Sequence, residues 1–430
     1  MSSLIRSRLA RTIAVSCLVA AATSAAMAQD QKTVTLMHVE QTPAYVEMWR
    51  KVADQYEAAH PGVKIDLQFL ENEAFKAKLP TLLQSNDAPD LFYSWTGGVL
   101  EAQDDAGAVR DITPEMQADG GAWANSYLPA TIGAVTFGDR TLCVPQKISY
   151  ISFFYNKPLF EKAGVNADDI KTWSDFLAAV KALKDAGITP IAAGGGDKWP
   201  LHFYWSYLAI RLGGQEAFDA AKAGQGDGFT SEPFVEAFQK LKELGEMEPF
   251  QAGYLGTRWQ DTLALFGDGR AAMLLSFDNT AARQAAAAAD GKGIAPEDLG
   301  VFPFPAVEGG AGEPTDTFGG VNCFVVSRDA SPEAIDFVKF FTGKEAETQM
   351  AAIGMMIPAA KGAGEAITDP LVLKSSNDLA KSNFHQLFLD QDLGPSTGRV
   401  VNDVTVEVVS GSMDPEEAAQ EIQDAFELDM

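Results

Sequence analysis

Three stretches near the start of the chain decide its fold, and each is a short, largely apolar run: T-V-T-L-M-H-V at 33–39, V-K-I-D-L-Q-F at 63–69 and L-F-Y-S-W at 91–95. Alternating or continuous apolar residues over so few positions are typical of β-strands. The clean alternation of the second run predicts a strand with one covered face.

Helical patterns fill the two intervals between these strands. Thr42 and Pro43 open the first helix as N-cap and first-turn proline, and 60–62 (H-P-G) ends it. The second helix runs through 75–83 and contains Pro80, where we expect a bend. The order β-α-β-α-β predicts a parallel sheet with right-handed crossovers. Such sheets bind ligands in the loops at the carboxyl ends of their strands.

The remainder of the chain continues this α/β pattern. Residues 144–156 are extended and rich in β-branched and aromatic side chains, and 172–175 (T-W-S-D) has the spacing of a capping box. Residues 194–196 (G-G-G) form a loop before an aromatic-rich helix that starts at Pro200. Further helices are expected at 233–244, 257–266, 332–342, 345–353 and 415–427. No long linker interrupts the chain, so we expect it to pass between two lobes on extended strands.

The composition excludes several classes of function. The 430 residues carry a formal net charge of −26, which opposes binding to nucleic acids and to anionic membrane surfaces. The four His and three Cys have no zinc-ligand spacing, and no phosphate loop, nucleophile elbow or zinc-protease helix occurs. Residues 390–392 (D-Q-D) begin like a calcium loop, but Gly394 comes too early. We therefore expect no cofactor and no metal.

The first 28 residues have the pattern of a secretory signal. Arg6, Arg8 and Arg11 precede an apolar run that ends in a small-x-small site, which predicts export and cleavage after Ala28. The mature chain then keeps Cys143 and Cys323. In an oxidising compartment these two can form a disulfide, or they can be two buried thiols of one core, and spacing leaves both readings open.

Three aromatic segments lie where strands or glycine loops end: 92–95 (F-Y-S-W), 198–205 (K-W-P-L-H-F-Y-W) and 277–279 (F-D-N). Sugars present apolar C–H faces and polar rims, so their sites combine flat aromatic rings with planar polar side chains. This pattern favours Trp95, Trp199 and Phe277 as stacking groups. Trp49 and Trp173 have helix positions that favour packing in the core.

The chain also resembles the extracellular solute-binding proteins of bacterial sugar ABC transporters, the group that includes maltose-binding protein. The resemblance rests on ordered segments across nearly the whole mature chain: 88–95 (A-P-D-L-F-Y-S-W), 144–145, 154–157 (F-Y-N-K), 159–164, 172–176 and 266–273 (F-G-D-G-R-A-A-M). The segments 198–200 and 388–391 are closest to binders of raffinose-type or related oligosaccharides.

The resemblance implies a two-lobed periplasmic binding protein fold, in which each lobe is a sheet flanked by helices and the ligand lies in a cleft between the lobes. The N-terminal lobe is expected to hold 29–147 and 304–345, and the C-terminal lobe 148–303 and 346–430. Hinge strands are expected near 147–149 and 302–305.

The resemblance also assigns the site residues. The stacking aromatic after the third strand falls on Trp95, and the aromatics of the second lobe fall on Trp199 or Trp205 and on Phe277 with Asp278. Maltose binders have a Gly-Pro-Trp segment at this last position, so its Asp indicates a different sugar. The other positions expected at the cleft are His38, Glu40, Gln41, Glu71, Asn72 and Asp390. Gly319 and Gly320 fit a close backbone approach or, equally, a bulge.

These features predict the substrate-binding component of an ABC importer rather than an enzyme. The protein is expected in the periplasm as a monomer that captures a neutral sugar by hinge closure and delivers it to the membrane permease, and an oligosaccharide is the sugar we expect. A secreted glycoside hydrolase or lyase that uses two of the many carboxylates is the alternative reading, and a cell-surface adhesion module is a second one.

Overall fold

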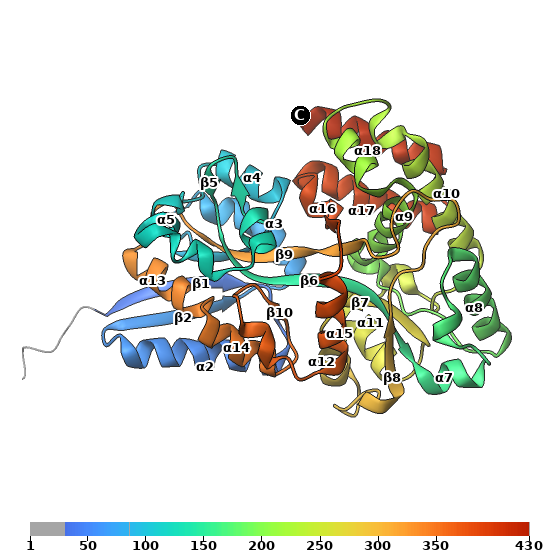
Figure 1. Cartoon of the computed structure of the whole chain (residues 1–430), viewed down its shortest axis with the longest axis horizontal. Helices are drawn as coiled ribbons and strands as arrows, with labels where there is room; N and C mark the ends of the chain where they lie inside the picture. Colours follow the sequence, from blue (N-terminus) through green and yellow to red (C-terminus); the bar gives the residue numbers. More distant parts are fainter. Residues whose placement is uncertain (1–30, 86, 430) are drawn as a thin grey trace, which may run out of the picture.

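The computed structural model describes residues 31–85 and 87–429 (Figure 1). The signal segment expected at 1–28 lies outside the described residues. Two lobes lie side by side in Figure 1, and the strands β6 and β9 run between them through the middle of the molecule. No helix in the described ranges is long and apolar enough to cross a membrane.

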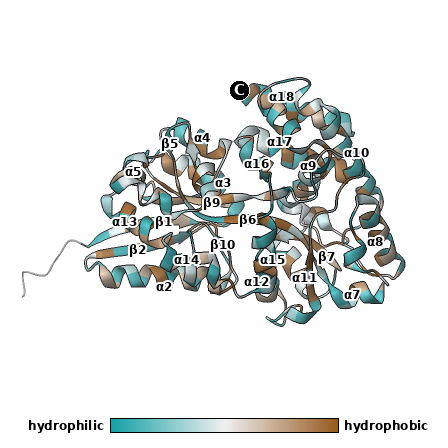
Figure 2. Ribbon diagram, in the orientation of Figure 1, coloured by the Kyte–Doolittle hydropathy of each residue, from teal (hydrophilic) through white to brown (hydrophobic). Residues whose placement is uncertain are grey.

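The first lobe is built on the strands expected from the sequence. β1 (Lys32–His38) lies between β2 (Val63–Phe69) and β3 (Leu91–Trp95), and both pairings are parallel. The connections are α2 (Pro43–Ala59) and α3 (Asn72–Leu83), so the predicted β-α-β-α-β order is confirmed. Helix α2 buries Tyr45, Trp49 and Tyr56 on one face. Figure 2 shows hydrophilic and hydrophobic residues mixed along α2, as one buried and one exposed face require.

The other elements complete the two lobes. The remaining elements associated with the first lobe are α4 (Gly98–Asp105), α5 (Thr113–Gly121), α6 (Pro129–Ala134), β4 (Thr136–Phe137), β5 (Arg140–Thr141), α13 (Pro332–Phe341), α14 (Lys344–Ala352), β10 (Ile357–Pro358) and α15 (Pro370–Leu379). Those of the second lobe are α7 (Lys157–Lys162), α8 (Trp173–Asp185), α9 (Trp199–Lys222), α10 (Glu232–Glu246), α11 (Trp259–Gly267), β7 (Met273–Phe277), α12 (Thr280–Ala287), β8 (Leu299–Phe302), β11 (His385–Leu387), α16 (Leu389–Asp392), α17 (Pro395–Val409) and α18 (Pro415–Asp429).

Two long strands join the lobes. The first half of β6 (Val144–Asn156) pairs with β9 (Thr317–Val326), and its second half pairs with β7 and β8. β9 in turn pairs with β3 on its other side, which ties it to the first sheet. A strand shared by two sheets resists bending except where its neighbours change. The neighbours change in the middle of β6, from β9 to β7 and β8, and at the start of β9, where β11 pairs with it.

The hydrophobic cores mark the lobe boundaries. One core holds buried side chains from Val34 to Tyr150 and again from Val321 to Val372. The other begins at Ile151, includes Phe318, and resumes at Phe388. The expected first crossing near 147–149 lies close to this division. The expected second crossing at 302–305 is wrong, because the chain stays in the second lobe until β9.

A buried arginine explains that second boundary. Arg211 of α9 donates to five backbone carbonyls of the segment before β9, those of Phe304, Pro305, Glu313, Pro314 and Asp316. A buried cation is costly unless its donors are satisfied, so these bonds hold the segment against the second lobe. The expected boundary at 345 is also wrong, because α14 packs on α2 and its Met350 belongs to the first core.

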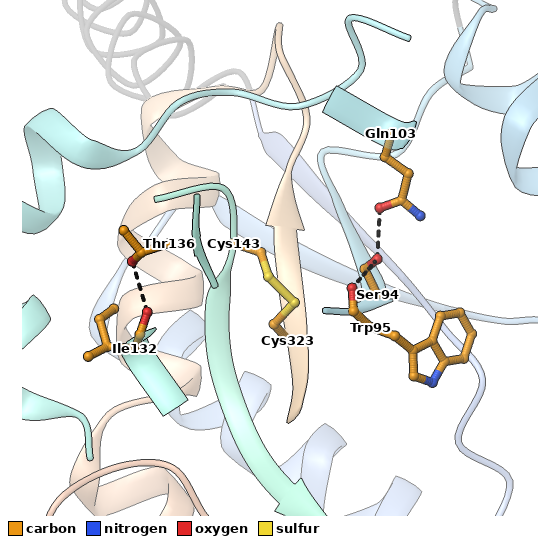
Figure 3. Close-up of a disulfide and its surroundings, with 7 residues drawn as sticks. All are labelled: Ser94, Trp95, Gln103, Ile132, Thr136, Cys143 and Cys323. Atoms are coloured by element: carbon orange, nitrogen blue, oxygen red, sulfur yellow. Dashed lines mark hydrogen bonds between the residues drawn. A yellow bond between two sulfur atoms is a disulfide. The ribbon is translucent and has the colours of Figure 1, made fainter. Parts of the chain in front are cut away.

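A disulfide joins β9 to the residue directly before β6. Cys143 and Cys323, whose Cα atoms are 5.9 Å apart, are bonded to each other and are fully buried (Figure 3). This settles the question that spacing had left open. The bond closes a loop with a sequence separation of 180 residues, which contains most of the second lobe. It therefore fixes the first-lobe ends of both crossing strands relative to each other.

Candidate functional site

A cavity lies between the lobes, above the crossing strands. Its enclosed space is about 130 Å³, and it opens to solvent at its mouth. The side chains that line it come from both lobes: Val39, Glu40, Gln41, Asn72, Lys76, Tyr93, Trp95, Lys147, Ser149, Trp199, Phe203, Trp259, Gln260, Phe277, Asp278, Asn279, Arg283, Asn322, Phe388, Asp390 and Gln391. A ligand held there contacts both lobes at once.

The floor of the cavity is one row across three strands. The register aligns Trp95 of β3 with Asn322 of β9, and Asn322 with Lys147 of β6. Paired residues on neighbouring strands point to the same face of a sheet, so these three side chains rise together into the cavity. Ser149 also faces it and donates from its Oγ to Asn322 Oδ1 at 3.3 Å.

The first-lobe wall contains two aromatic side chains, the buried Tyr93 and the more exposed Trp95. Trp95 ends β3 and is held edge-on by Phe75 and Tyr93, with ring centroids 6.1 and 5.5 Å away. It is only half-buried, because part of its indole borders the cavity. The Lys76 ammonium lies 5.6 Å from the indole centroid, within the range of a cation–π contact. The rest of this wall, Gln41 and Asn72 included, is largely polar.

The second-lobe wall is a cluster of aromatic rings. Trp199 lies 5.1 Å from Trp259 and 6.0 Å from Phe277, measured between centroids. Phe203 and Phe388 stack on each other at 5.4 Å. These rings come from the starts of α9 and α11, from the end of β7 and from the segment before α16. Together they form a continuous apolar surface on which a sugar ring can stack.

The glycine loop before α9 determines where Trp199 lies. A Cβ on Gly195 would lie 2.9 Å from the Leu255 Cα, and one on Gly194 would lie 2.9 Å from Thr262 Oγ1. These close approaches require glycine, since a side chain would push the loop off its neighbours. The loop therefore packs tightly against the segment leading into α11, and Trp199 meets Trp259.

Charged side chains close one end of the cavity. Arg283 of α12 donates from Nη2 to Glu40 Oε2 at 2.7 Å, which joins the two lobes. Glu40 Oε1 accepts the Thr42 backbone N–H at 2.9 Å at the start of α2. Burial alone would raise the pKa of Glu40, but Arg283 and Lys147 outweigh it and the pKa is lowered. Glu40 is therefore a carboxylate that is already paired.

Lys147 and Asp278 lie beside this pair and keep hydrogen-bonding capacity. Burial lowers the pKa of Lys147, while Glu40 opposes the shift. Burial raises the pKa of Asp278 to about 6. Asp278 Oδ1 accepts the Tyr150 backbone N–H at 3.2 Å. Within the described part of the chain, the Lys147 ammonium makes no hydrogen bond to another residue. One donor and one acceptor are thus available to a ligand hydroxyl pair.

Asp390 lies at the opposite end of the cavity, where neighbouring side chains hold its carboxylate in place. His202 Nε2 lies 3.3 Å from its Oδ1, and Gln391 and Asn402 donate to its Oδ2 at 2.8 and 3.3 Å. Lys76, from the first lobe, lies 3.8 Å away. Burial would raise the pKa of Asp390, but His202 and Lys76 hold it below its usual range. This carboxylate is a fixed acceptor at the cavity edge.

Most of the residues expected from the sequence meet in this cavity. Those that line it are Glu40, Gln41, Asn72, Trp95, Trp199, Phe277, Asp278 and Asp390. They come from loops and strand ends far apart in the chain, as expected for a site between lobes.

The expectation that Trp205 belongs to the site conflicts with its position. Trp205 is fully buried, stacks on Phe238 at 4.6 Å, and donates from its indole to the Phe234 carbonyl at 3.2 Å. On α9 it faces α10, away from the cavity. Of the two alternatives, only Trp199 lines the cavity.

His38 and Glu71 also lie outside the cavity lining. His38 is buried against Trp49, with centroids 5.1 Å apart, because the strand alternation turns it toward α2. Glu71 serves as N-cap of α3 and accepts the backbone N–H groups of Glu73 and Ala74. Glu71 also lies 3.9 Å from Arg258 Nη2 of the second lobe.

Gly319 and Gly320 support the strands but do not line the cavity. A Cβ on Gly319 would lie 1.8 Å from the Ser149 carbonyl oxygen, and one on Gly320 would lie 2.6 Å from the Phe388 ring. The pairing with β6 is regular here, and the shift in register lies between Pro145 and Lys147. Of the two readings, close approach is therefore the one that the geometry fits.

Several lining residues were missed by sequence reasoning. Lys147 and Asn322 lie inside strands that read as continuous core, Arg283 lies in an alanine-rich helix, and Trp259 begins a helix. One signal was present, since a lysine within an otherwise apolar strand needs a partner or a cavity. The others have no distinctive local pattern.

The site combines polar side chains with aromatic rings. Its polar groups are placed to exchange hydrogen bonds, and its rings to stack. Among residues 31–85 and 87–429, no group of three or more His, Cys, Asp or Glu could hold a metal ion.

Comparison with known proteins agrees with this architecture. The profile of the bacterial extracellular solute-binding protein family matches residues 41–348. An uncharacterised ABC-transporter extracellular-binding protein of Pyrococcus horikoshii is 25% identical over 396 residues, which cover 89% of this chain and 85% of the relative.

Two solved structures show the same fold. One, from work on xylan utilization by the thermophilic bacterium Caldanaerobius polysaccharolyticus, has a TM-score of 0.84 and 27% identity, and covers 91% of this chain and 99% of that one. The other is a solute-binding protein in complex with raffinose, with a TM-score of 0.74 and 20% identity, covering 92% and 99%. The predicted fold class and the resemblance are confirmed: this chain belongs to the bacterial extracellular solute-binding protein family.

Proposed function

We propose that the protein is the receptor of an ABC importer for a neutral oligosaccharide. The observation that carries this proposal is the pairing of walls across the cavity: an indole from the first lobe faces an aromatic cluster from the second, with amide, carboxylate and ammonium groups around them. Stacking rings with a polar rim match the two kinds of surface that a sugar presents.

The charges of the cavity favour an uncharged ligand. Glu40 is paired with Arg283, and Asp390 lies near Lys76 and His202. Lys147 and Asp278 remain as one cation and one carboxyl group, so neither sign is in excess. A polyanionic sugar would find no basic cluster here, and the net charge of −26 would oppose its approach.

Closure of the lobes is the mechanism of capture. The ligand contacts both walls only when the lobes approach, so it stabilises the closed form by its higher affinity for that form. The crossing strands allow the movement, and the disulfide keeps them in register within the first lobe. The closed form then presents its combined surface to the permease.

A glycoside hydrolase or lyase is not favoured by any observation in the site. The buried carboxylates of the cavity are either paired, as Glu40 is, or held by several neighbours, as Asp390 is. Incubation with oligosaccharides would separate the two classes, because an enzyme generates new reducing ends and a carrier does not.

Thermal-shift and calorimetric titration test the proposal. The ligands are two ladders, xylose to xylohexaose and galactose to stachyose, with glucuronate and a sulfated disaccharide as charged controls. A tight ligand raises the melting temperature by mass action. We expect members of at least one neutral ladder to raise the melting temperature and the charged controls to leave it unchanged. Absence of a shift with every neutral sugar would refute carbohydrate binding.

We further propose that the chain is exported, cleaved after Ala28 and monomeric in the periplasm. The signal pattern and the disulfide between Cys143 and Cys323 support export to an oxidising compartment. N-terminal sequencing and light scattering of the secreted protein check these points. A mature protein that begins elsewhere, or that scatters as a dimer, would contradict them.

A further inference from the structure

Helix α11 takes its N-terminal cap from another part of the chain. Its own N-cap residue is Arg258, and a guanidinium carries no acceptor. Asp197, from the loop before α9, supplies one: its Oδ2 accepts the Trp259 backbone N–H at 2.7 Å. A carboxylate at this place satisfies an N–H group that has no partner within the helix, and it lies at the positive end of the helix dipole. The start of α11 therefore depends on a residue 62 positions earlier.

The Asp197 side chain is buried and uses both of its oxygens. It is only 8% exposed, and its Oδ1 accepts from Arg258 Nε at 3.3 Å. Beside it, the Gly196 N–H donates to the Thr257 carbonyl at 2.9 Å. Together with the cap, these bonds fasten the loop before α9 to the segment that leads into α11.

The backbone is strained directly after Asp197. Lys198 has φ 61° and ψ −54°, a conformation that residues with a side chain rarely adopt. Such a conformation persists only where the surroundings hold it. The Lys198 N–H donates to the Gly195 carbonyl at 3.2 Å, and its Nζ donates to Asp403 Oδ1 of α17 at 2.6 Å. The next residue, Trp199, begins α9.

The residues on either side of Lys198 reach the same tryptophan. Asp197 holds the backbone N–H of Trp259, and the Trp199 ring lies against the Trp259 ring with centroids 5.1 Å apart. Both rings line the cavity, and their centroids lie 6.0 and 5.6 Å from that of Phe277. The placement of two rings of the second-lobe wall thus depends on a bond that is made outside the ring cluster.

We infer that Asp197 is a positioning residue of the second-lobe wall. It fixes the start of α11 against the start of α9, and so it holds Trp199 and Trp259 in place before a ligand arrives. The inference rests on the proposed function and goes beyond it, because Asp197 acts on binding through the two tryptophans. A wall that is already formed loses less conformational freedom when a sugar stacks on it, which raises affinity.

Fluorine NMR of the mature protein labelled with 5-fluorotryptophan tests the inference without a ligand. The seven tryptophans give seven signals, and Trp199→Phe and Trp259→Phe identify two of them. Asp197→Ala should shift or broaden these two signals, because α11 loses its cap and its bond to the loop. Unchanged signals of Trp199 and Trp259 in this variant would overturn the inference.

Asp111 offers a matched control, because it makes the same two kinds of bond in the first lobe. It accepts the backbone N–H of Thr113, the first residue of α5, at 2.9 Å, and Arg140 Nε at 3.3 Å. Asp111→Ala should therefore leave the signals of Trp199 and Trp259 at their wild-type positions. A shift of both signals would mean that the loss of any such carboxylate disturbs the wall, and this too would overturn the inference.

Two conservative variants separate geometry from charge. Asp197→Asn keeps an oxygen within reach of the Trp259 N–H, and asparagine caps a helix as well as aspartate does, so both signals should return to their wild-type positions. Asp197→Glu keeps the charge but moves it by one methylene, so it should behave like Asp197→Ala, and it replaces that variant if the alanine protein does not fold. Recovery in Asp197→Glu and not in Asp197→Asn would refute positioning by the cap.

Calorimetric titration with xylose to xylohexaose and with galactose to stachyose links the wall to binding. For the sugar that binds wild type most tightly, Asp197→Ala should weaken binding at least about tenfold, whereas Asp197→Asn and Asp111→Ala should match wild type. Full affinity of Asp197→Ala would refute its role in binding. If no sugar binds wild type, the proposed function fails, and the fluorine signals still decide whether Asp197 positions the two tryptophans.

Discussion

The two walls of the cavity are built on different principles. The first-lobe wall has one partly exposed ring, Trp95, at a strand end among polar side chains, whereas the second-lobe wall is a cluster in which Trp199, Phe277 and their neighbours pack on one another. A partly exposed ring at the edge of a core can be removed with less effect on its surroundings. A clustered ring supports the positions of the others. The second wall should therefore dominate both affinity and local stability.

The largest effect is expected from Trp199→Ala. The substitution removes the ring that contacts Trp259 and Phe277 and leaves a hole in the wall. Loss of stacking and of packing should weaken binding about 100-fold and lower the melting temperature. Calorimetry and thermal melting give the two values. Trp199→Phe, which keeps a ring, should recover most of both. Retention of full affinity by Trp199→Ala would mean that the aromatic wall is not the binding surface.

Trp95→Ala should have a smaller effect, and on binding alone. The indole is partly exposed and borders the cavity, so its loss should cost about 20-fold in affinity, with little change in the melting temperature. The comparison with Trp199→Ala is made on the same ligand. If Trp95→Ala were the more damaging of the two, the first wall would be the dominant one.

Acid should weaken binding through Asp278. Burial raises its pKa to about 6, and the ionised form is the acceptor for a ligand hydroxyl. As the pH falls through 6 the group takes up a proton, so affinity should fall about tenfold between pH 7.5 and 5. Lys147 and Arg283 are the charged groups that act on it, and both oppose the rise of its pKa.

Protonation of Asp278 has the opposite effect on the stability of the fold: it weakens binding but stabilises the folded state. A raised pKa means that the folded state binds the proton more tightly, so this group stabilises the fold as the pH falls from above 6 toward 3.8. Weaker binding at pH 5 would therefore not reflect unfolding through Asp278. Asp278→Asn, which does not titrate, should bind with a flat pH profile. A profile unchanged from wild type would assign the titration to another group.

The smallest effect on binding is expected from Trp205→Phe. Trp205 packs between α9 and α10 and donates to the Phe234 carbonyl, far from either wall. Its replacement should lower the free energy of unfolding by about 2 kcal/mol, because a buried carbonyl loses its donor and the core loses volume. The dissociation constant should stay within about twofold of wild type. Denaturant unfolding and titration separate the two quantities, and a large loss of affinity would return Trp205 to the site.

Prediction from sequence succeeded where signals are local. Thr42 with Pro43, and Thr172 with Asp175, mark helix starts that the structure confirms. The strand ends pointed to Gln41, Asn72 and Trp95, because parallel strands bring their carboxyl ends to one edge. The prediction that His38 lies at the cavity failed. Neighbouring residues of a strand point to opposite faces of the sheet, and His38 lies on the face toward α2.

The second crossing between the lobes shows a different limit. The segment 302–305 is extended in the sequence and resembles a hinge, but Arg211, almost a hundred positions earlier, binds the carbonyls that follow it. No local pattern reveals which carbonyls a distant guanidinium will meet. The division at 345 failed for the same reason, because the packing of α14 on α2 is a contact between remote segments.

The amino-acid sequence by itself determined the alternation of strands and helices, the pattern of a secretory signal, the acidic character and the resemblance to solute-binding proteins. Propensity, periodicity and charge can be read from the residues themselves and their neighbours in the chain. Only the tertiary structure decided which tryptophan faces the ligand, that Cys143 bonds to Cys323, and that Lys147, Asn322 and Trp95 form one row. These depend on the register of paired strands and on the approach of two lobes. Both are set by the packing of residues that lie far apart in the chain.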